Sequence, residues 1–213
     1  MGARLVVLAS GRGSNLQAII DACTRGAIDG RVVAVVSNVD GAGAIGRAER
    51  AGIPAVVLPA TRGEPRRDYD TRLAAGVAPY APDWVVLAGW MRLLSSAFLD
   101  AHPGRVVNLH PALPGQFPGL HAIERAHQEA LGGTRTATGV MVHLVPDEGV
   151  DDGPVLATAT VPILPDDTLV ALTERVHRAE HELLVTAIGH LVAGEGGMLT
   201  EDRFVPADDP HGG

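Results

Sequence analysis

The chain has no lysine: its 17 basic residues are all arginine, and 25 acidic residues bring the formal net charge to −8. General nucleic-acid binding usually depends on a basic surface, so this charge balance argues against a nucleic-acid partner. Cysteine is almost absent too. The single Cys23 excludes a disulfide bond within the chain and fits a reducing compartment.

Long apolar runs are also missing. No stretch approaches the roughly 20 residues that a transmembrane helix needs, so no membrane partner is expected. The run LVVLAS near the N-terminus is too short for the apolar core of a secretory signal and leads directly into a glycine turn. We therefore expect a cytoplasmic protein, either a monomer or a homodimer, whose 213 residues suffice for one sizeable core.

What is present is an alternation of short apolar runs, rich in β-branched residues, with helical patterns. The runs predict seven strands, at residues 4–10, 32–38, 55–59, 84–89, 105–110, 140–145 and 154–163. The predicted helices are 14–25, 42–52, 65–78, 95–101, 121–131 and 167–193. Strands that alternate with helices predict an α/β fold: an open, mostly parallel twisted sheet of about seven strands with helices on both faces.

Two details of this pattern are testable. The last two strands have no helix between them, so we expect them to run antiparallel to the rest or to form an edge. Asp166 or Asp167 is expected to cap the long final helix.

The first glycine turn, GRGSN at residues 11–15, follows a strand and opens a helix. It departs from the dinucleotide fingerprint, because Leu16 stands at the third glycine position, and it has no lysine for a triphosphate loop. Free backbone N–H groups and the Ser14 hydroxyl at a helix N-terminus suit a single phosphate. A plain turn in which Ser14 is the N-cap, with no ligand, stays open beside it.

A second group of polar residues follows the fifth strand. Asn108 and His110 are two residues apart, so their side chains point the same way at the strand's carboxyl end, where ligands of open α/β sheets gather. Together they could polarise a carbonyl, although a histidine there could equally satisfy a backbone group. The acidic loop 147–152 offers Asp151 as the carboxylate that orients the histidine; the other reading is a solvated acidic turn.

A metal site is not expected. The nine histidines are scattered and show no ligand spacing. His177 and His181 are four residues apart on the final predicted helix, but no acidic pair accompanies them in the usual places.

Taken together, the motifs resemble the phosphoribosylglycinamide formyltransferases, within the family of folate-dependent formyltransferases. The matching segments, in the family's order and spacing, are SGRGSNLQAII, LAGWMRLLSSAFL (87–99), NLHPAL (108–113), FPGLHA (117–122) and DEGVDDGPV (147–155). The resemblance runs from about residue 3 to 193. The asparagine, histidine and aspartate motifs are shared with the wider family, whereas the Gly-Ser-Asn loop is typical of the ribonucleotide enzymes.

The resemblance implies an activity and a division of the chain. The activity is transfer of a formyl group from 10-formyltetrahydrofolate, the co-substrate, to the amine of glycinamide ribonucleotide in purine biosynthesis, by direct attack through a tetrahedral intermediate. The chain would form a single formyltransferase domain over 1–213. Its nucleotide-binding half would be about 1–100 and its catalytic half about 101–193, followed by a frayed tail at 205–213.

The resemblance also implies residue roles. The catalytic set would be Asn108, His110 and Asp151, with Asn108 donating to the developing oxyanion and Asp151 keeping His110 charged. The ribonucleotide would be bound by Gly13, Ser14 and Asn15 at its phosphate and by Glu180 at its ribose hydroxyls. The folate would be bound by Arg66, Met91, Arg92, Leu93, Leu94, Val145 and Asp147.

The chain departs from the family pattern at three places: the loop HPALPGQFPG has its proline one position early, Trp90 replaces a common phenylalanine, and Met141 replaces a small polar residue.

Other functions also stay open. A formyltetrahydrofolate hydrolase or another formyltransferase of the family would share the catalytic set. A non-catalytic sensor of nucleotide phosphates would need only the first loop.

Overall fold

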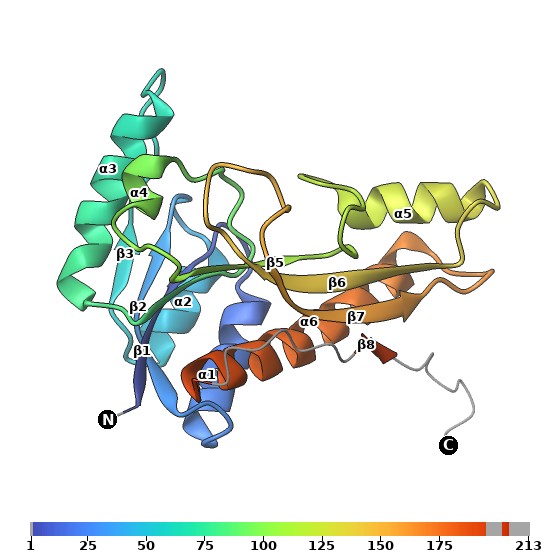
Figure 1. Ribbon diagram of the computed structural model, residues 1–213, viewed down its shortest axis with the longest axis horizontal. Helices are drawn as coiled ribbons and strands as arrows, with labels where there is room; N and C mark the ends of the chain where they lie inside the picture. The colour runs from blue at the N-terminus through green and yellow to red at the C-terminus, as the bar shows by residue number, and fades with distance from the viewer. Residues whose placement is uncertain (1, 195–201, 205–213) are drawn as a thin grey trace.

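The sheet has eight strands in the order β3-β2-β1-β4-β5-β6-β7-β8 in this computed structural model, which describes residues 2–194 and 202–204 (Figure 1). The strands are β1 (Ala3–Leu8), β2 (Gly30–Ser37), β3 (Ala55–Val57), β4 (Trp84–Leu87), β5 (Val106–His110), β6 (Ala137–Leu144), β7 (Val155–Pro162) and β8 (Asp202–Phe204). The helices are α1 (Ser14–Thr24), α2 (Gly43–Arg50), α3 (Arg66–Val77), α4 (Ser96–Leu99), α5 (Ala122–Leu131) and α6 (Leu169–Val192), with a 3-10 turn at Ala78–Tyr80. The predicted fold class is confirmed, and the short β8 is an addition to it.

Strand direction differs in part from the expectation. Strands β1 to β5 are parallel, β6 is antiparallel to β5, and β7 is antiparallel to β6. Because two reversals restore the original direction, β7 runs the same way as β1 to β5, and the prediction that both strands oppose the rest was wrong for β7. Neither strand is the edge, since β8 pairs in parallel with β7. The expected frayed tail at 205–213 lies outside the described residues.

The core has two layers, one on each face of the sheet. Consecutive residues of β1 alternate between them: Leu5 and Val7 pack with α1, α2, α5 and α6, whereas Val6 and Leu8 pack with α3 and α4. All four are fully buried. This explains the unbroken apolar run in the sequence, because a central parallel strand has no solvent-facing side.

The start of the final helix also differs from the expectation. Thr168, rather than Asp166 or Asp167, is the N-cap of α6, and its hydroxyl accepts a hydrogen bond from the Ala171 N–H at 3.2 Å. Asp167 instead makes two hydrogen bonds with the Arg175 guanidinium, at 2.6 and 2.8 Å. The cap prediction was wrong because Arg175, two turns into α6, and the Leu164 N–H hold the Asp167 carboxylate.

The strand order places the functional loops together. Strand order reverses between β1 and β4, and ligands of open α/β sheets bind outside the carboxyl ends of the strands at such a reversal. The loops after β1, β4 and β5 all leave the sheet at this edge, because those strands are parallel. Among the described helices, none is both long enough and apolar enough to cross a membrane.

Candidate active site

The first loop ends at Gly13, which is the N-cap of α1 with a φ of 75°. A side chain there would be strained, and its Cβ would lie 2.7 Å from Ala44 Cα, so the position requires glycine. Ser14 is the first helical residue, which corrects the reading of Ser14 as N-cap. Since Gly13 has no capping side chain and the first turn has no acid, the N–H groups at this helix end are available to an anion.

Asn15 and Glu180 meet beside this loop although they are far apart in the sequence. Asn15 Nδ2 donates to Glu180 Oε2 at 3.0 Å, and both side chains are buried. Burial raises the pKa of Glu180 to about 7, against the opposing hydrogen bond from Asn15. Asn15 Oδ1 is buried without a hydrogen-bond partner within the described part of the chain, so this predicted pair of nucleotide-binding residues retains an unused polar atom.

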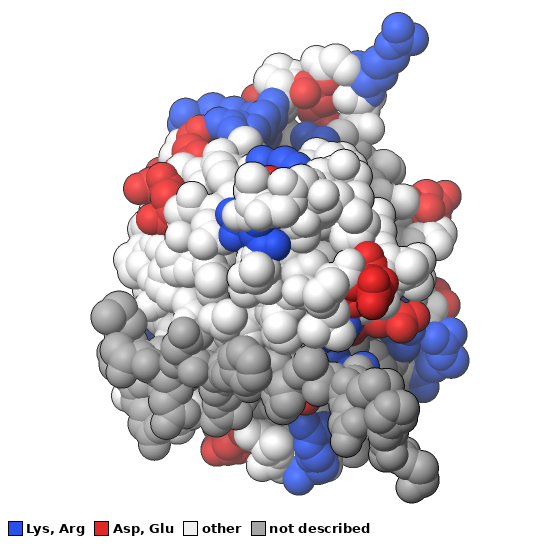
Figure 2. All heavy atoms as spheres, turned by 90° about the vertical axis from the view of Figure 1, so that its right-hand side faces the viewer, with Lys and Arg blue, Asp and Glu red and all other residues white. Residues whose placement is uncertain are grey.

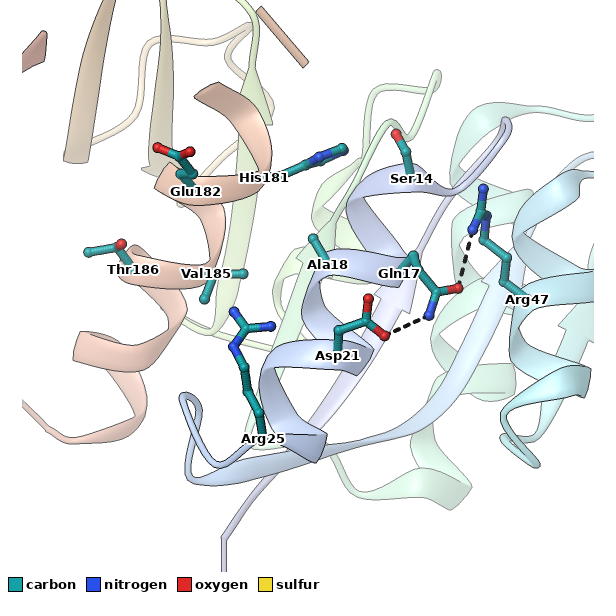
Figure 3. A pocket seen from close by; sticks show the side chains of 10 residues that line it. All are labelled: Ser14, Gln17, Ala18, Asp21, Arg25, Arg47, His181, Glu182, Val185 and Thr186. Atoms are coloured by element: carbon teal, nitrogen blue, oxygen red, sulfur yellow. Dashed lines mark hydrogen bonds between the residues drawn. The ribbon is translucent and has the colours of Figure 1, made fainter. Parts of the chain in front are cut away.

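A wide hollow of about 680 Å³ lies between α1 and α6, with Ser14 at one end (Figure 3). Three of its polar side chains are hydrogen-bonded to one another: Gln17 Nε2 donates to Asp21 Oδ1 at 2.9 Å, and Arg47 Nη1 donates to Gln17 Oε1 at 3.2 Å. Neither Asn15 nor Glu180 lines it. The hollow is therefore separate from the predicted nucleotide contacts, apart from Ser14.

A narrower cavity of about 380 Å³, called the slot below, opens between the loops that follow β4, β5 and β6. Six of the seven residues predicted to bind folate line it: Met91, Arg92, Leu93, Leu94, Val145 and Asp147. Its size is that of a small-molecule site. Exposed apolar side chains, among them Met91, Leu120 and Val150, also belong to its lining and offer an apolar surface to a flat ring.

Arg66, the seventh predicted residue, does not line the slot. It is the first residue of α3 and pairs with Glu148, whose other carboxylate oxygen accepts the Ser96 N–H at 2.9 Å. This hydrogen bond, followed by the charge of Arg66, keeps the pKa of Glu148 below its usual value. Glu148 thus joins the loop 145–154 to α3 through Arg66 and to α4 through the Ser96 N–H.

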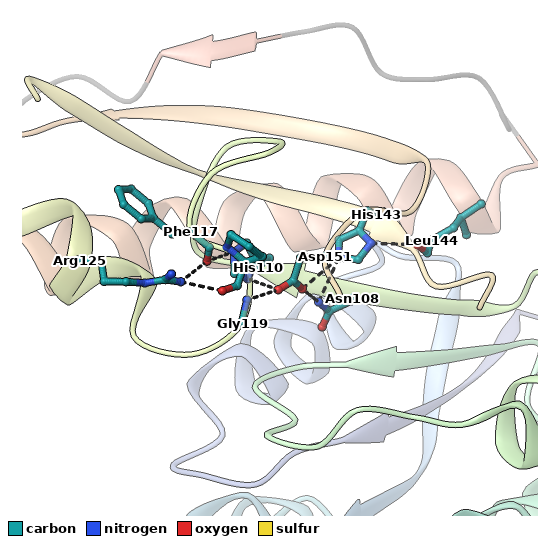
Figure 4. A network of polar contacts seen from close by, with 9 residues as sticks. Asn108, His110, Phe117, Gly119, Arg125, His143, Leu144 and Asp151 are labelled. Atoms are coloured by element: carbon teal, nitrogen blue, oxygen red, sulfur yellow. Dashed lines mark hydrogen bonds and ion pairs between the residues drawn. The ribbon is translucent and has the colours of Figure 1, made fainter. Parts of the chain in front are cut away.

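The three predicted catalytic residues all line the slot, and Figure 4 shows the polar contacts that join them. His110 Nδ1 lies 3.2 Å from Asp151 Oδ2, and Asn108 Nδ2 donates to Asp151 Oδ1 at 3.0 Å. The Gly119 N–H also donates to Asp151 Oδ2, at 2.8 Å. Three segments distant in the sequence are therefore joined through one carboxylate.

His110 is buried, and desolvation lowers its pKa below the ordinary value. Asp151 and the Phe117 carbonyl oppose this lowering. Asp151 therefore favours the charged form of His110, in the direction expected, while burial acts against it. Burial alone would raise the pKa of Asp151, but contacts with His143 and the Gly119 N–H outweigh it and hold that pKa below the usual value.

Both catalytic donors are already bonded to protein atoms. His110 Nε2 lies 3.1 Å from the Phe117 carbonyl oxygen. Asn108 uses one amide N–H on Asp151 and the other on His143 Nε2, at 3.1 Å. The expected donation from Asn108 to an oxyanion would thus require one of these bonds to break.

The backbone around the network is unusual. Asp151, Phe117 and His121 all have positive φ, at 54°, 46° and 60°, a region that residues other than glycine rarely adopt. Such conformations persist where surrounding contacts hold them, and they gather at functional sites.

Sequence reasoning missed two residues of this site. His143 lies opposite Asn108 in the antiparallel β5–β6 pair, a signal that depends on strand register. Ser10 donates to Asn38 Oδ1 at 2.6 Å and accepts from the Met91 N–H at 2.9 Å, so it joins the loops after β1, β2 and β4. Within the described residues, no three His, Cys, Asp or Glu side chains are grouped so as to hold a metal ion.

One side of the molecule, toward α5, has a broad uncharged area with basic and acidic side chains dispersed around it (Figure 2). Neither sign of charge dominates the described part of this face.

The chain matches the family model described as Formyl transferase over residues 3–188. It is 45% identical over 204 residues to a phosphoribosylglycinamide formyltransferase of Schizosaccharomyces pombe, covering 90% of this chain and 98% of the relative. It is 44% identical to the Escherichia coli protein of the same name, covering 89% and 87%. The crystal structure of glycinamide ribonucleotide transformylase 1 from Geobacillus kaustophilus is similar with a TM-score of 0.83 and 41% identity, over 90% of this chain and all of that one.

Proposed function

Because the chain belongs to the formyl transferase family, we propose that it transfers the formyl group of 10-formyltetrahydrofolate to the amine of glycinamide ribonucleotide in purine biosynthesis. The observation that carries this proposal is the Asn108–His110–Asp151 network in the lining of a largely apolar slot. The names of the relatives supply the nucleotide and the formyl group, and the formyl transferase family supplies the folate as donor.

The nucleotide is assigned to the first loop. Its phosphate meets the uncapped N-terminus of α1 at Gly13, Ser14 and Asn15, where N–H groups and the helix dipole favour a dianion. Its ribose hydroxyls meet Glu180, which accepts hydrogen bonds best when ionised. We assign about residues 1–100 to a nucleotide-binding half and about 101–193 to a catalytic half of one domain. Glu180 lies in the catalytic half but binds the nucleotide.

The folate is assigned to the slot, whose apolar lining and volume of about 380 Å³ fit the faces of a flat ring system. Backbone atoms of Arg92 and Leu94 are assigned to the polar edge of that ring. Met91, Arg92, Leu93 and Leu94 form one wall, and Val145 and Asp147 belong to the loop on the other side. The bound folate supplies the formyl carbon that the amine attacks. Arg66 acts on the folate side indirectly, through Glu148 and the loop it anchors.

His110 and Asp151 carry the chemistry in this proposal. As the amine attacks, negative charge develops on the formyl oxygen, and a ring N–H of His110 stabilises it; such a donor is typically worth about 10²–10³ in rate. Asp151 holds Nδ1 of the ring and, through a water molecule, accepts the proton that the amine loses and returns it to the leaving nitrogen. For this role, His110 Nε2 must leave its contact with the Phe117 carbonyl oxygen.

Asn108 is assigned the role expected from the resemblance, a donor to the developing oxyanion. Its amide nitrogen contacts Asp151 and His143 in this structure, so one of these contacts must break for the N–H to reach the formyl oxygen.

The test is a comparison of steady-state kinetics for Asp151→Asn, His110→Ala and the matched control Asp152→Asn, an exposed neighbour outside the slot. We expect the first two variants to lose at least about 100-fold in kcat while the nucleotide binds with nearly unchanged affinity in calorimetry. Wild-type turnover in either variant would contradict the assignment of these residues.

We also propose a cytoplasmic location and a monomeric or homodimeric state. Light scattering of the purified protein distinguishes these two states from any larger assembly, which would contradict the second proposal.

A further inference from the structure

The two peptide bonds before Gly13 are held from the side of α2. The Gly11 carbonyl oxygen accepts a hydrogen bond at 3.1 Å from the N–H of Ala44, which lies in the first turn of α2. The Arg12 carbonyl oxygen accepts one from Nε of Arg47, also on α2, at 2.9 Å. Helix α2 therefore draws two successive carbonyls of the first loop toward itself.

Peptide geometry then fixes where the matching N–H groups point. Both peptide bonds are trans, and in a planar trans peptide the carbonyl of one residue and the N–H of the next point in opposite directions. Since the Gly11 and Arg12 carbonyls face α2, the N–H groups of Arg12 and Gly13 face away from it. Neither N–H takes part in a backbone hydrogen bond within the described residues. Successive N–H groups presented in this way favour an anion.

The arrangement requires α2 to lie directly against the loop. Gly43 is the first residue of α2, and a Cβ added to it would lie 2.9 Å from the Arg12 carbonyl oxygen and 3.1 Å from Arg12 Cα. On the other side of the contact, a Cβ on Gly13 would lie 2.7 Å from Ala44 Cα. A glycine on each side thus allows the close approach that both hydrogen bonds need.

The Arg47 side chain is fixed at a second point. Its Nη1 donates to Gln17 Oε1 at 3.2 Å, and Gln17 in turn donates to Asp21, so Arg47 joins the loop to α1 (Figure 3). Because the guanidinium is planar and rigid, the contact with Gln17 also sets the direction of the Nε–H bond.

We propose that Arg47 is a positioning residue for the nucleotide phosphate, which acts by holding the Arg12 carbonyl so that the Gly13 N–H faces the phosphate. The identity of the anion rests on the proposed function, whereas the orientation of the peptide does not. Arg47 bonds the loop on the side opposite to these N–H groups, so it touches neither substrate in this role.

Three substitutions separate the hydrogen bond from the charge. Arg47→Gln places an uncharged N–H donor the same number of bonds from the backbone as Nε, Arg47→Lys keeps the charge but has a methylene at that point, and Arg47→Met has neither. We expect the nucleotide KM to rise about 10-fold in Arg47→Met, less than about threefold in Arg47→Gln, and more in Arg47→Lys than in Arg47→Gln. The kcat and the KM for the folate should not change.

A control tests the effect of charge at a distance. Arg50→Met removes an exposed arginine from the same helix and should leave the nucleotide KM within about twofold of wild type. A nucleotide KM that is normal in Arg47→Met, or that is better preserved in Arg47→Lys than in Arg47→Gln, would overturn the proposal.

An acceptor without the phosphate distinguishes positioning from general damage. With glycinamide riboside in place of the ribonucleotide, Arg47→Met should retain the kcat/KM of wild type within about twofold, because there is no phosphate for the loop to bind. An equal loss of kcat/KM with both acceptors would show a merely structural role and overturn the proposal.

A titration with inorganic phosphate tests the orientation without turnover. In ¹⁵N-labelled protein, the backbone amide signal of Gly13 should shift on addition of phosphate, and Arg47→Met should need about 10-fold more phosphate for the same shift, whereas Arg47→Gln should resemble wild type. No shift in wild type, or equal titrations in wild type and Arg47→Met, would overturn the proposal. Absence of formyl transfer by the wild type would instead refute the proposed function and leave this titration decisive.

Discussion

Replacing Glu180 with glutamine should stabilise the protein at alkaline pH and weaken nucleotide binding. The carboxyl group is 6% exposed, and burial raises its pKa from 4.5 to about 7. The folded protein therefore binds this proton more tightly than the unfolded chain does. The contribution to stability is fully present below pH 4.5 and is lost as the pH rises through about 7.

The size of the effect follows from the shift. A difference of about 2.5 pKa units, at about 1.4 kcal/mol per unit, corresponds to roughly 3 kcal/mol. Glutamine resembles the protonated acid and does not titrate. Glu180→Gln should thus match wild type near pH 4.5 and exceed its free energy of unfolding by up to about 3 kcal/mol at pH 8.5.

Urea unfolding of wild type and variant at a series of pH values measures this difference, and groups common to both proteins cancel in it. Glu182→Gln is the matched control, because Glu182 is exposed on the same helix, and it should stay within about 0.5 kcal/mol of wild type at every pH. A stability difference for Glu180→Gln that does not change with pH would refute the reasoning.

In the same proteins, the KM of wild type for the nucleotide should fall as the pH rises through about 7, and the KM of Glu180→Gln should not.

Three further predictions concern the same site. Asp151→Asn should lower the pKa of His110 further, because the carboxylate opposes the effect of burial; an NMR titration in which that pKa rises would contradict this. Gly13→Ala should reduce the free energy of unfolding by at least about 1 kcal/mol, since the residue has positive φ and its Cβ would approach Ala44 at 2.7 Å; urea unfolding measures it, and an unchanged midpoint would count against the geometry. Ser14→Ala should raise the KM for the nucleotide while leaving the KM for the folate unchanged, and an unaltered nucleotide KM would place the phosphate elsewhere.

Local patterns in the sequence were enough to predict the sheet and the positions of Asn108 and His110, whereas the folate-binding residues followed from the family resemblance. Apolar runs separated by helical periodicity predict β1 to β7 to within a few residues, because each buried strand must be apolar on both sides. The two-residue spacing of Asn108 and His110 fixes their common direction on β5, and both line the slot.

Features set by contacts between distant segments were not predictable in this way. His143 joins the network only because β6 pairs with β5 in one register, which no short window of sequence specifies. Arg66 is directed to Glu148, 82 residues away, by the fold of the loop 145–154. The lowered pKa of His110 depends on burial, which only the packed structure shows.

The central claim is the transfer of a formyl group to a nucleotide amine, and isotope tracing tests it most directly. Purified protein is mixed with 10-formyltetrahydrofolate carrying a ¹³C label in its formyl carbon, with and without glycinamide ribonucleotide, and the products are identified by mass spectrometry and ¹³C NMR. The account predicts that the label appears on the amine of the nucleotide, only when the nucleotide is present, and that Asp151→Asn abolishes this. Release of the label as free formate regardless of the nucleotide would indicate a hydrolase, and a label that stays on the folate would indicate no catalysis; either result would contradict the account.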